Sequence, residues 1–238
     1  MATISAYDSE AKKDNIEKWF CNALVTNAFK VHVGVPGNAF ALDDHNFQST
    51  KSLPLCIKET YIAQKDPDEY TVMKKTKPHN VVITEGLAEN IAARHVVVDH
   101  FDTCGSWIVH RHTIKHRMMS GMYANKAIVR VTISMRGNNM SEAKLIGTIL
   151  RDTKRYSRSS SYDVFLLNLQ ELCDGNKDLM HNIKHIDPKS HFYKYGSPHD
   201  PTNKSVMINF YMLLKKKTAN KGSRELKNLT QWGWWRID

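Results

Sequence analysis

The segment Ala127-Ile-Val-Arg-Val-Thr-Ile-Ser-Met135 is followed by Gly137-Asn-Asn139 and then by Ser141-Glu-Ala-Lys-Leu-Ile-Gly-Thr-Ile-Leu150. The first part alternates well enough to predict a strand, and the Gly-Asn-Asn tripeptide favours a turn. Ser141 is a suitable N-cap for a helix. The apolar residues of that helix recur at helical spacing and form one stripe: Ala143, Leu145, Ile146, Ile149 and Leu150. This strand, turn and helix are the clearest structural unit in the sequence.

Other segments add strands around this unit. Short β-branched runs at 81–83, 96–98 and 107–109 predict strands, and the alternation within 206–214 predicts another. The apolar stretch 162–169 is compatible with either a strand or a helix. Because helices and strands are mixed along a chain of 238 residues, we expect an α+β fold. It should be a single compact domain with a mainly antiparallel sheet and packed helices.

An amphipathic helix is predicted near the N-terminus, over residues 9–28. Such a helix either packs on its own core or docks onto a neighbouring subunit. The apolar residues that we expect to support self-association are Ile16, Trp19 and Phe20. The predicted organisation is therefore an N-terminal helix within 1–30, available for subunit docking, and one core domain over 31–238.

Positive charge is concentrated in the second part of the chain. The formal net charge is +10, with −2 over residues 1–93 and +12 over residues 94–238. Two basic segments together carry more positive charge than the net charge of the entire chain. They are residues 110–160, with a net charge of +9, and residues 204–236, with a net charge of +7. Such segments attract phosphate polymers or anionic lipid head groups. The alternative is a solvated basic surface with no dedicated partner.

The predicted helix after Ser141 carries most of its cations on one side. Lys144, Arg151, Arg155 and Arg158 fall on the face opposite the apolar stripe, with Lys154 beside them. We predict that these five residues bind an anionic partner, with a second contact at Lys215, Lys216 and Lys217. The nearby tryptophans Trp232, Trp234 and Trp235 either close the core or stack on a partner.

No motif of a metal centre or of catalysis is recognisable. His110, His112 and His116 lie among arginines and lysines, which would repel a dication. His181 and His185 have a helical spacing but enclose no acidic general base. The glycine-rich phosphate-binding and nucleophile-elbow signatures are missing, and the adjacent Asp43 and Asp44 are weak indications of acid–base chemistry. We therefore predict no catalytic residue, no metal, no cofactor and no small-molecule substrate.

The order of elements in 127–172 resembles the start of the folded core of rhabdovirus-type matrix proteins. The quoted strand, turn and basic amphipathic helix are followed by a loop and an apolar element, Val164 to Leu172. This resemblance implies a virion protein that self-associates and bridges a ribonucleoprotein and the inner leaflet of an envelope.

These observations together predict a non-enzymatic viral structural protein, matrix-like and oligomeric. Its expected partners are further copies of itself, nucleic acid or ribonucleoprotein, and an anionic membrane surface. Because no secretory signal or membrane-spanning apolar run is recognisable, the expected location is intracellular, in host cytoplasm or nucleus, and in the virion. The alternatives are a nucleic-acid-binding coat or movement-type protein, a lattice-forming occlusion-body protein, and a metal-dependent enzyme.

Overall fold

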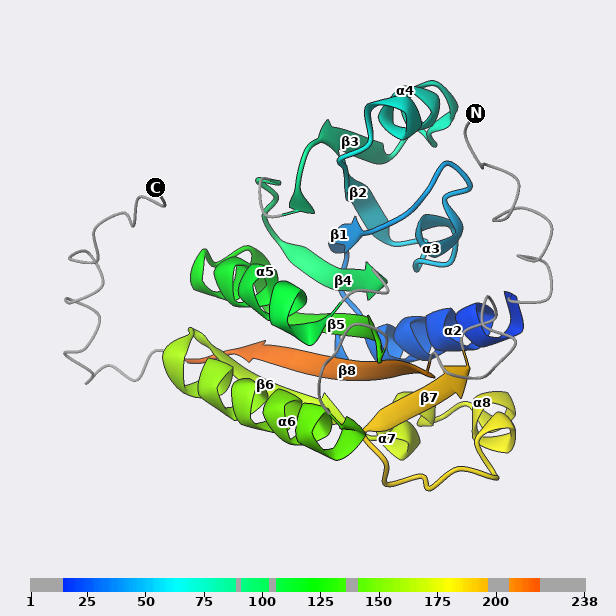
Figure 1. The fold of residues 1–238 in the computed structure, drawn as a ribbon, viewed down its shortest axis with the longest axis vertical. Coiled ribbons are helices and arrows are strands. Elements are labelled where there is room, and N and C mark those ends of the chain that lie inside the picture. The colour runs from blue at the N-terminus through cyan, green and yellow to red at the C-terminus, as the bar shows by residue number, and fades with distance from the viewer. Residues whose placement is uncertain (1–14, 89–90, 103–105, 136–140, 197–205, 219–238) are drawn as a thin grey trace.

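One sheet of eight strands organises the structure. The computed structural model describes residues 15–88, 91–102, 106–135, 141–196 and 206–218. The sheet order is β3-β2-β1-β4-β5-β8-β6, and β7 also pairs with β8 (Figure 1). The strands are β1 (Gly37–Ala41), β2 (Ile57–Gln64), β3 (Val81–Glu85), β4 (Val96–Asp102), β5 (Tyr123–Ser134), β6 (Tyr162–Leu167), β7 (Phe192–Gly196) and β8 (Val206–Lys216).

Strands β3, β2, β1, β4 and β5 are parallel to one another, whereas β8 runs antiparallel to β5, β6 and β7. The predicted combination of helices and strands in a single domain is confirmed, but the sheet is mostly parallel rather than mainly antiparallel. Parallel strands are covered on both faces, so they appear in a sequence as short continuous apolar runs without alternation. Val96, Val97 and Val98 of β4 are all completely buried, as this rule requires.

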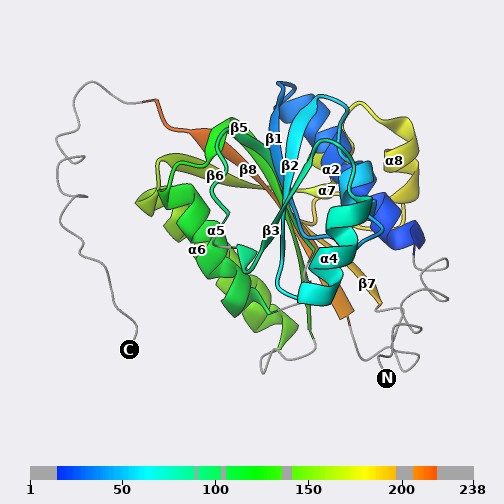
Figure 2. The ribbon, with the colours of Figure 1, turned by 90° about the horizontal axis from the view of Figure 1, so that it is seen from above.

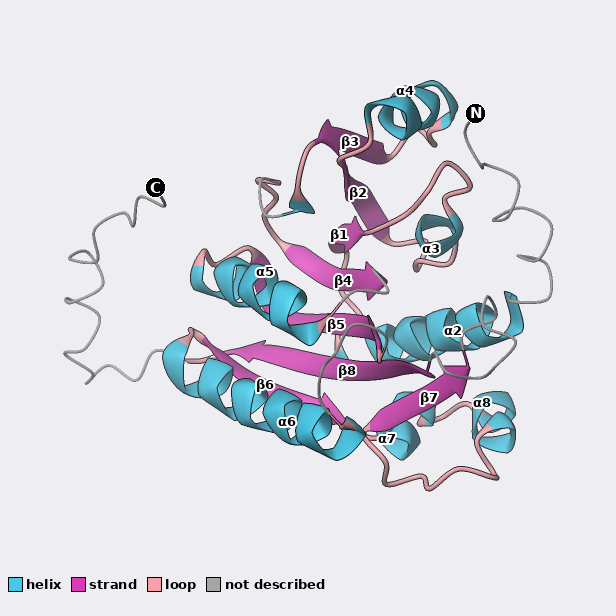
Figure 3. Cartoon of the chain, viewed as in Figure 1, coloured by secondary structure: helices cyan, strands magenta, loops and turns pink. Residues whose placement is uncertain are grey.

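Helices cover both faces of the sheet (Figures 2 and 3). Helices α5 (Trp107–Met119) and α6 (Glu142–Ser159) lie on one face, and α2 (Asn15–His32), α7 (Leu169–Cys173) and α8 (Lys177–Asn182) lie on the other. Two shorter helices, α3 (Gln48–Lys51) and α4 (Pro67–Thr76), belong to the connections that follow β1 and β2. The two main core clusters are therefore separated by the sheet.

The strand predicted at 107–109 is wrong, because these residues begin α5. Trp107, Ile114 and Met118 are completely buried and recur at helical spacing, so they form the inner side of this helix. A β-branched pair such as Ile108-Val109 is too short to decide between helix and strand when tertiary packing favours the helix.

The predicted N-terminal helix is present as α2, which packs against the chain's own sheet and α7. Phe20 is buried in that core, whereas Trp19 is 62% exposed. The side chain of Ile16 lies outside the described part of the structure, as do Trp232, Trp234 and Trp235. The strand predicted at 206–214 and the helix after Ser141 are confirmed as β8 and α6. Within the described residues, no helix is long and apolar enough to cross a bilayer.

Candidate functional site

The carboxyl ends of the parallel strands define the place where a ligand would bind. The chain passes from β1 to β2 on one side of β1, and the later strand β4 pairs with β1 on the other side. In open sheets of this kind, ligands bind outside the carboxyl ends of the strands, at the point where the strand order reverses. Here that point lies between β1 and β4.

The loop after β1 carries two aspartates with different environments. The Asp43 carboxylate accepts hydrogen bonds from the backbone N–H groups of Ser49 and Thr50, at 3.0 and 2.7 Å, and from the Thr50 hydroxyl at 2.7 Å. Burial raises the pKa of Asp43, and these hydrogen bonds limit the rise. One carboxylate oxygen of Asp44 accepts a hydrogen bond from the backbone N–H of Asn46, at 2.9 Å. Asp43 therefore holds the loop on α3, and Asp44 retains capacity to accept further hydrogen bonds.

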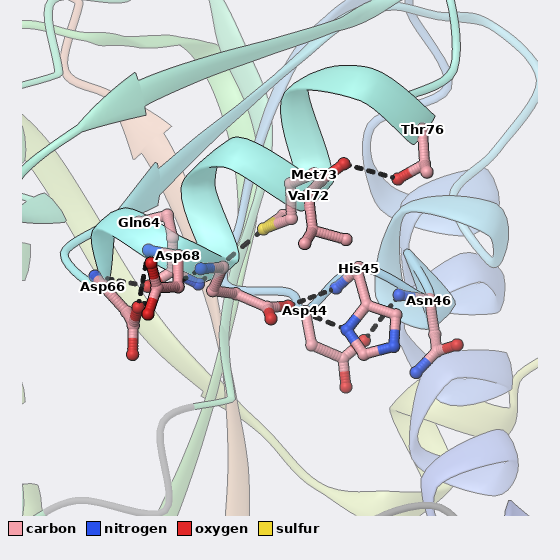
Figure 4. Close-up of polar contacts among 10 residues, drawn as sticks. Asp44, His45, Asn46, Gln64, Asp66, Asp68, Val72, Met73 and Thr76 are labelled. Carbon is pink, nitrogen blue, oxygen red and sulfur yellow. Dashed lines mark hydrogen bonds and ion pairs between the residues drawn. The ribbon is translucent and has the colours of Figure 1, made fainter. Parts of the chain in front are cut away.

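His45, labelled in Figure 4, ties the same loop to α4 through its contacts with Glu69. One carboxylate oxygen of Glu69 lies 2.7 Å from the backbone nitrogen of His45 and 3.0 Å from its Nδ1. Glu69 occupies this position because α4 begins directly after β2. The carboxylate of Asp66 caps the helix by accepting from the N–H groups of Asp68 and Glu69, and Pro67 stands at the first helical position.

The ends of β2 and β3 complete the site. Gln64 and Glu85 are register partners on these two strands, and the Gln64 side-chain oxygen accepts from the backbone N–H of Asp66 at 3.0 Å. The Glu85 side chain is exposed, and it makes no hydrogen bond or ion pair with another described residue. On the other side of β1, the neighbouring strand β4 ends at Asp102. The carboxyl-edge site, as we call it, consists of Asp43, Asp44, His45, Gln64, Asp66, Glu69 and Glu85.

The chemistry of this set is that of an acceptor-rich, acidic surface. Carboxylate and amide oxygens accept hydrogen bonds from hydroxyl groups and attract cations. The loop from Leu42 to Phe47 contains no glycine, and its left-handed position, with φ of 53°, is occupied by Phe47. The loop therefore differs from the glycine-rich turn that cradles a pyrophosphate in dinucleotide-binding sheets. No group of three or more His, Cys, Asp or Glu residues in the described ranges is arranged to hold a metal ion.

The residues predicted to bind an anionic partner lie elsewhere. Arg151, Lys154, Arg155 and Arg158 are exposed on the outer side of α6. Lys215 and Lys216 end β8, and the Lys217 ammonium donates to the carbonyl oxygens of Ser157 and Ser160 at 2.5 and 3.0 Å. None of these residues belongs to the carboxyl-edge site. Sequence reasoning missed that site, although a usable signal was present, since Asp43 and Asp44 follow the buried strand β1 after a single residue, Leu42.

The fold is similar to that of several solved structures. M. jannaschii TYW2 in complex with AdoMet covers 90% of this chain and 80% of its own length, with a TM-score of 0.52 and 10% identity. The plantazolicin methyltransferase BpumL, in complex with a monoazolic desmethylPZN analog and SAH, has a TM-score of 0.58 and 8% identity. This match covers 87% of this chain and 88% of BpumL. The plantazolicin methyltransferase BamL, in complex with a triazolic desmethylPZN analog and SAH, has a TM-score of 0.53 and 10% identity. This match covers 87% of this chain and 89% of BamL. At these identities the likeness establishes the fold. No protein-family model and no curated protein matches the sequence.

These likenesses correct several linked predictions. The resemblance to a rhabdovirus-type matrix protein is wrong, and so is the non-enzymatic viral structural role that followed from it. The expectation of self-association with ribonucleoprotein or membrane partners, without a small-molecule substrate, is overturned by the likeness to these three structures, which hold AdoMet or SAH. The physical reason is that a strand, a helix and a second strand recur in many folds. The segment 127–172 contains no information on the parallel strands that precede it.

Proposed function

We propose that this chain is an S-adenosylmethionine-dependent methyltransferase. The observation that carries the proposal is the sheet topology, shared over about nine-tenths of the chain with structures that contain AdoMet or SAH. Fold alone does not define function, so the proposal also rests on the acceptor-rich edge formed by the ends of β1, β2 and β3, beside the point where this topology places a ligand.

The donor set at the carboxyl edge suits this cofactor. When bound, S-adenosylmethionine supplies an electrophilic methyl group on a positively charged sulfur atom. Its sulfonium and ammonium groups are cations, and its ribose presents two hydroxyl donors. Asp44, Asp66, Glu69 and Glu85 give the edge a negative field, which favours such a ligand over an anionic one.

Individual residues have separate tasks in this proposal. Gln64 and Glu85, adjacent on β2 and β3, would accept hydrogen bonds from ribose hydroxyls. Asp44, whose second oxygen is unused among the described contacts, would face the ammonium group of the amino-acid end. Asp43 and Glu69 would position the loop rather than touch the ligand, because their carboxylates already hold α3 and His45.

Isothermal titration calorimetry with AdoMet and with SAH tests the cofactor assignment. The wild-type protein should bind both, and Asp44→Asn and Glu85→Gln should each weaken binding by about tenfold, which corresponds to about 1.4 kcal/mol. Asp178→Asn, at an exposed carboxylate on α8, is the matched control and should bind like the wild type. Transfer of a tritiated methyl group to candidate peptides, nucleic acids and small metabolites then tests the reaction itself.

A folded wild-type protein that binds neither AdoMet nor SAH at millimolar concentration would refute the proposed function. Tight binding that is equally insensitive to all three substitutions would refute the carboxyl-edge site alone, because the cofactor would then occupy a different part of the molecule.

A further inference from the structure

A row of cations on α6 is not used by the proposed methyltransferase site. Arg151, Lys154, Arg155 and Arg158 are all exposed, and their spacing of three or four residues places them along one side of the helix, over a length of about 10 Å. In the described part of the chain, none of the four forms an ion pair; Arg151 donates only to the Thr148 hydroxyl, at 3.2 Å.

The only acidic residue in this part of α6 does not neutralise the row. Asp152 is buried, and its carboxylate accepts from the Trp107 indole at 2.9 Å and lies 3.7 Å from Arg111. The four cations therefore repel one another at helical spacings, at a cost of a few tenths of a kcal/mol for each close pair. An anionic partner would relieve this repulsion.

The row borders a groove with an apolar end. The groove has a volume of about 500 Å³ and is lined by Gly147, Leu150 and the four cations. A Cβ atom added at Gly147 would meet no atom within 4 Å, so the surface is open above this glycine. Leu150 is half-buried beside it. All six lining residues belong to α6, so the groove is an open depression on this helix. The gap at Gly147, beside Leu150, forms a notch for an apolar side chain next to guanidinium groups that can pair with carboxylates.

We propose that this groove is a docking site for an acidic polypeptide segment with a bulky apolar residue. Arginine pairs with carboxylates through two parallel hydrogen bonds, and the apolar residue would cover Gly147 and Leu150. A phosphate backbone would use the cations but would leave the apolar notch empty. This inference is independent of the proposed methyltransferase activity, because it uses no residue of the carboxyl-edge site.

Fluorescence anisotropy of a fluorescein-labelled peptide tests the docking site. The probe alternates glutamate and alanine around one central leucine, and a second probe has glycine in place of that leucine. Full-length protein should bind the leucine peptide with an affinity that falls as salt rises. The triple variant Arg151→Glu/Arg155→Glu/Arg158→Glu should weaken binding at least tenfold. A triple variant with the same charge change elsewhere, Lys58→Glu/Lys177→Glu/Lys184→Glu, should bind nearly as well as the wild type.

Gly147→Leu separates the notch from the charges. The added side chain has open space, so the helix should remain intact, which circular dichroism verifies for every variant. This substitution should weaken binding of the leucine peptide severalfold and leave the glycine peptide unaffected.

Three results would overturn the inference. They are no binding of the leucine peptide at low salt, equal losses in the two triple variants, and tighter binding of a single-stranded oligonucleotide of equal charge through the same arginines.

Discussion

Arg117 of α5 and Asp99 of β4 form an ion pair in the interior, with one guanidinium nitrogen 2.8 Å from each carboxylate oxygen. The side chains are 3% and 1% exposed. The Tyr123 hydroxyl donates to the same carboxylate, and the guanidinium lies over the rings of Phe40 and Phe101, 3.7 and 4.6 Å from their centroids. Burial raises the pKa of Asp99, and the charge of Arg117 opposes that rise. The pair links α5 to three adjacent strands of the parallel sheet.

Asp99→Ala should destabilise the protein by about 3–5 kcal/mol, because it leaves a buried guanidinium without its counter-charge. Urea unfolding at neutral pH measures the loss. The double variant Asp99→Leu/Arg117→Met removes both charges and should lose clearly less than the single variant. Equal losses in the two variants would mean that packing, and not the unpaired charge, dominates.

Gly37→Ala should also destabilise the fold, although it adds only a methyl group. A Cβ atom on Gly37 would lie 2.5 Å from a methyl carbon of Val97 and 2.8 Å from the backbone oxygen of His95. Since these atoms belong to β4 and to the residue before it, the start of β1 would have to move away from β4. We expect a cost of about 1–3 kcal/mol, measured by thermal unfolding. An unchanged midpoint would show that the two strands separate at this point without cost.

Gly147→Ala should have the opposite effect. Gly147 lies within α6, and a Cβ atom there would meet nothing within 4 Å. Because glycine is less favourable than alanine in a helix interior by about 1 kcal/mol, the substitution should raise the free energy of unfolding by up to that amount. The same urea titration measures it, and a loss of stability would contradict the open surface described above this residue.

His110 should make the protein sensitive to mild acid. Burial lowers the pKa of His110 to about 4, whereas an unfolded chain protonates histidine near 6.5. Between these two pH values the histidine is protonated in the unfolded state but neutral in the folded state, so the free energy of unfolding falls as the pH decreases. By pH 5 the wild type should lose about 2 kcal/mol more than a His110→Leu variant, relative to pH 7.

Unfolding titrations at pH 7, 6 and 5 measure this difference. His112→Leu, at an exposed histidine on the same helix, is the matched control and should follow the pH profile of the wild type. If the profile of His110→Leu also runs parallel to that of the wild type, then His110 is not neutral in the folded protein over this range.

The sequence predicts the second half of the sheet better than the first. The α6 stripe and its Ser141 cap are encoded locally, and the Ser141 hydroxyl accepts from the backbone N–H of Lys144 as expected. In contrast, β1 has only five residues, and β4 is buried on both faces. Neither strand therefore shows the alternation that would indicate its partner or its direction.

The candidate site is harder still to predict, because no local motif marks it. Asp44, Gln64 and Glu85 are about 20 residues apart in the sequence, and only the parallel order β3-β2-β1 brings them to one edge. The cations of α6 were easy to find because a helix repeats within a few residues. Their visibility drew the functional prediction to α6 and away from the carboxyl-edge site, whose residues are scattered along the sequence.

The position of β8 has a consequence for biosynthesis. This strand is the last one described along the chain, yet it is the pairing partner of β5, β6 and β7. A ribosome-bound chain that ends before Val206 would therefore expose one edge of β5 and two strands without any neighbour. Open edges of this kind promote aggregation. The nascent protein should consequently be most dependent on chaperones just before β8 emerges, and most protected immediately afterwards.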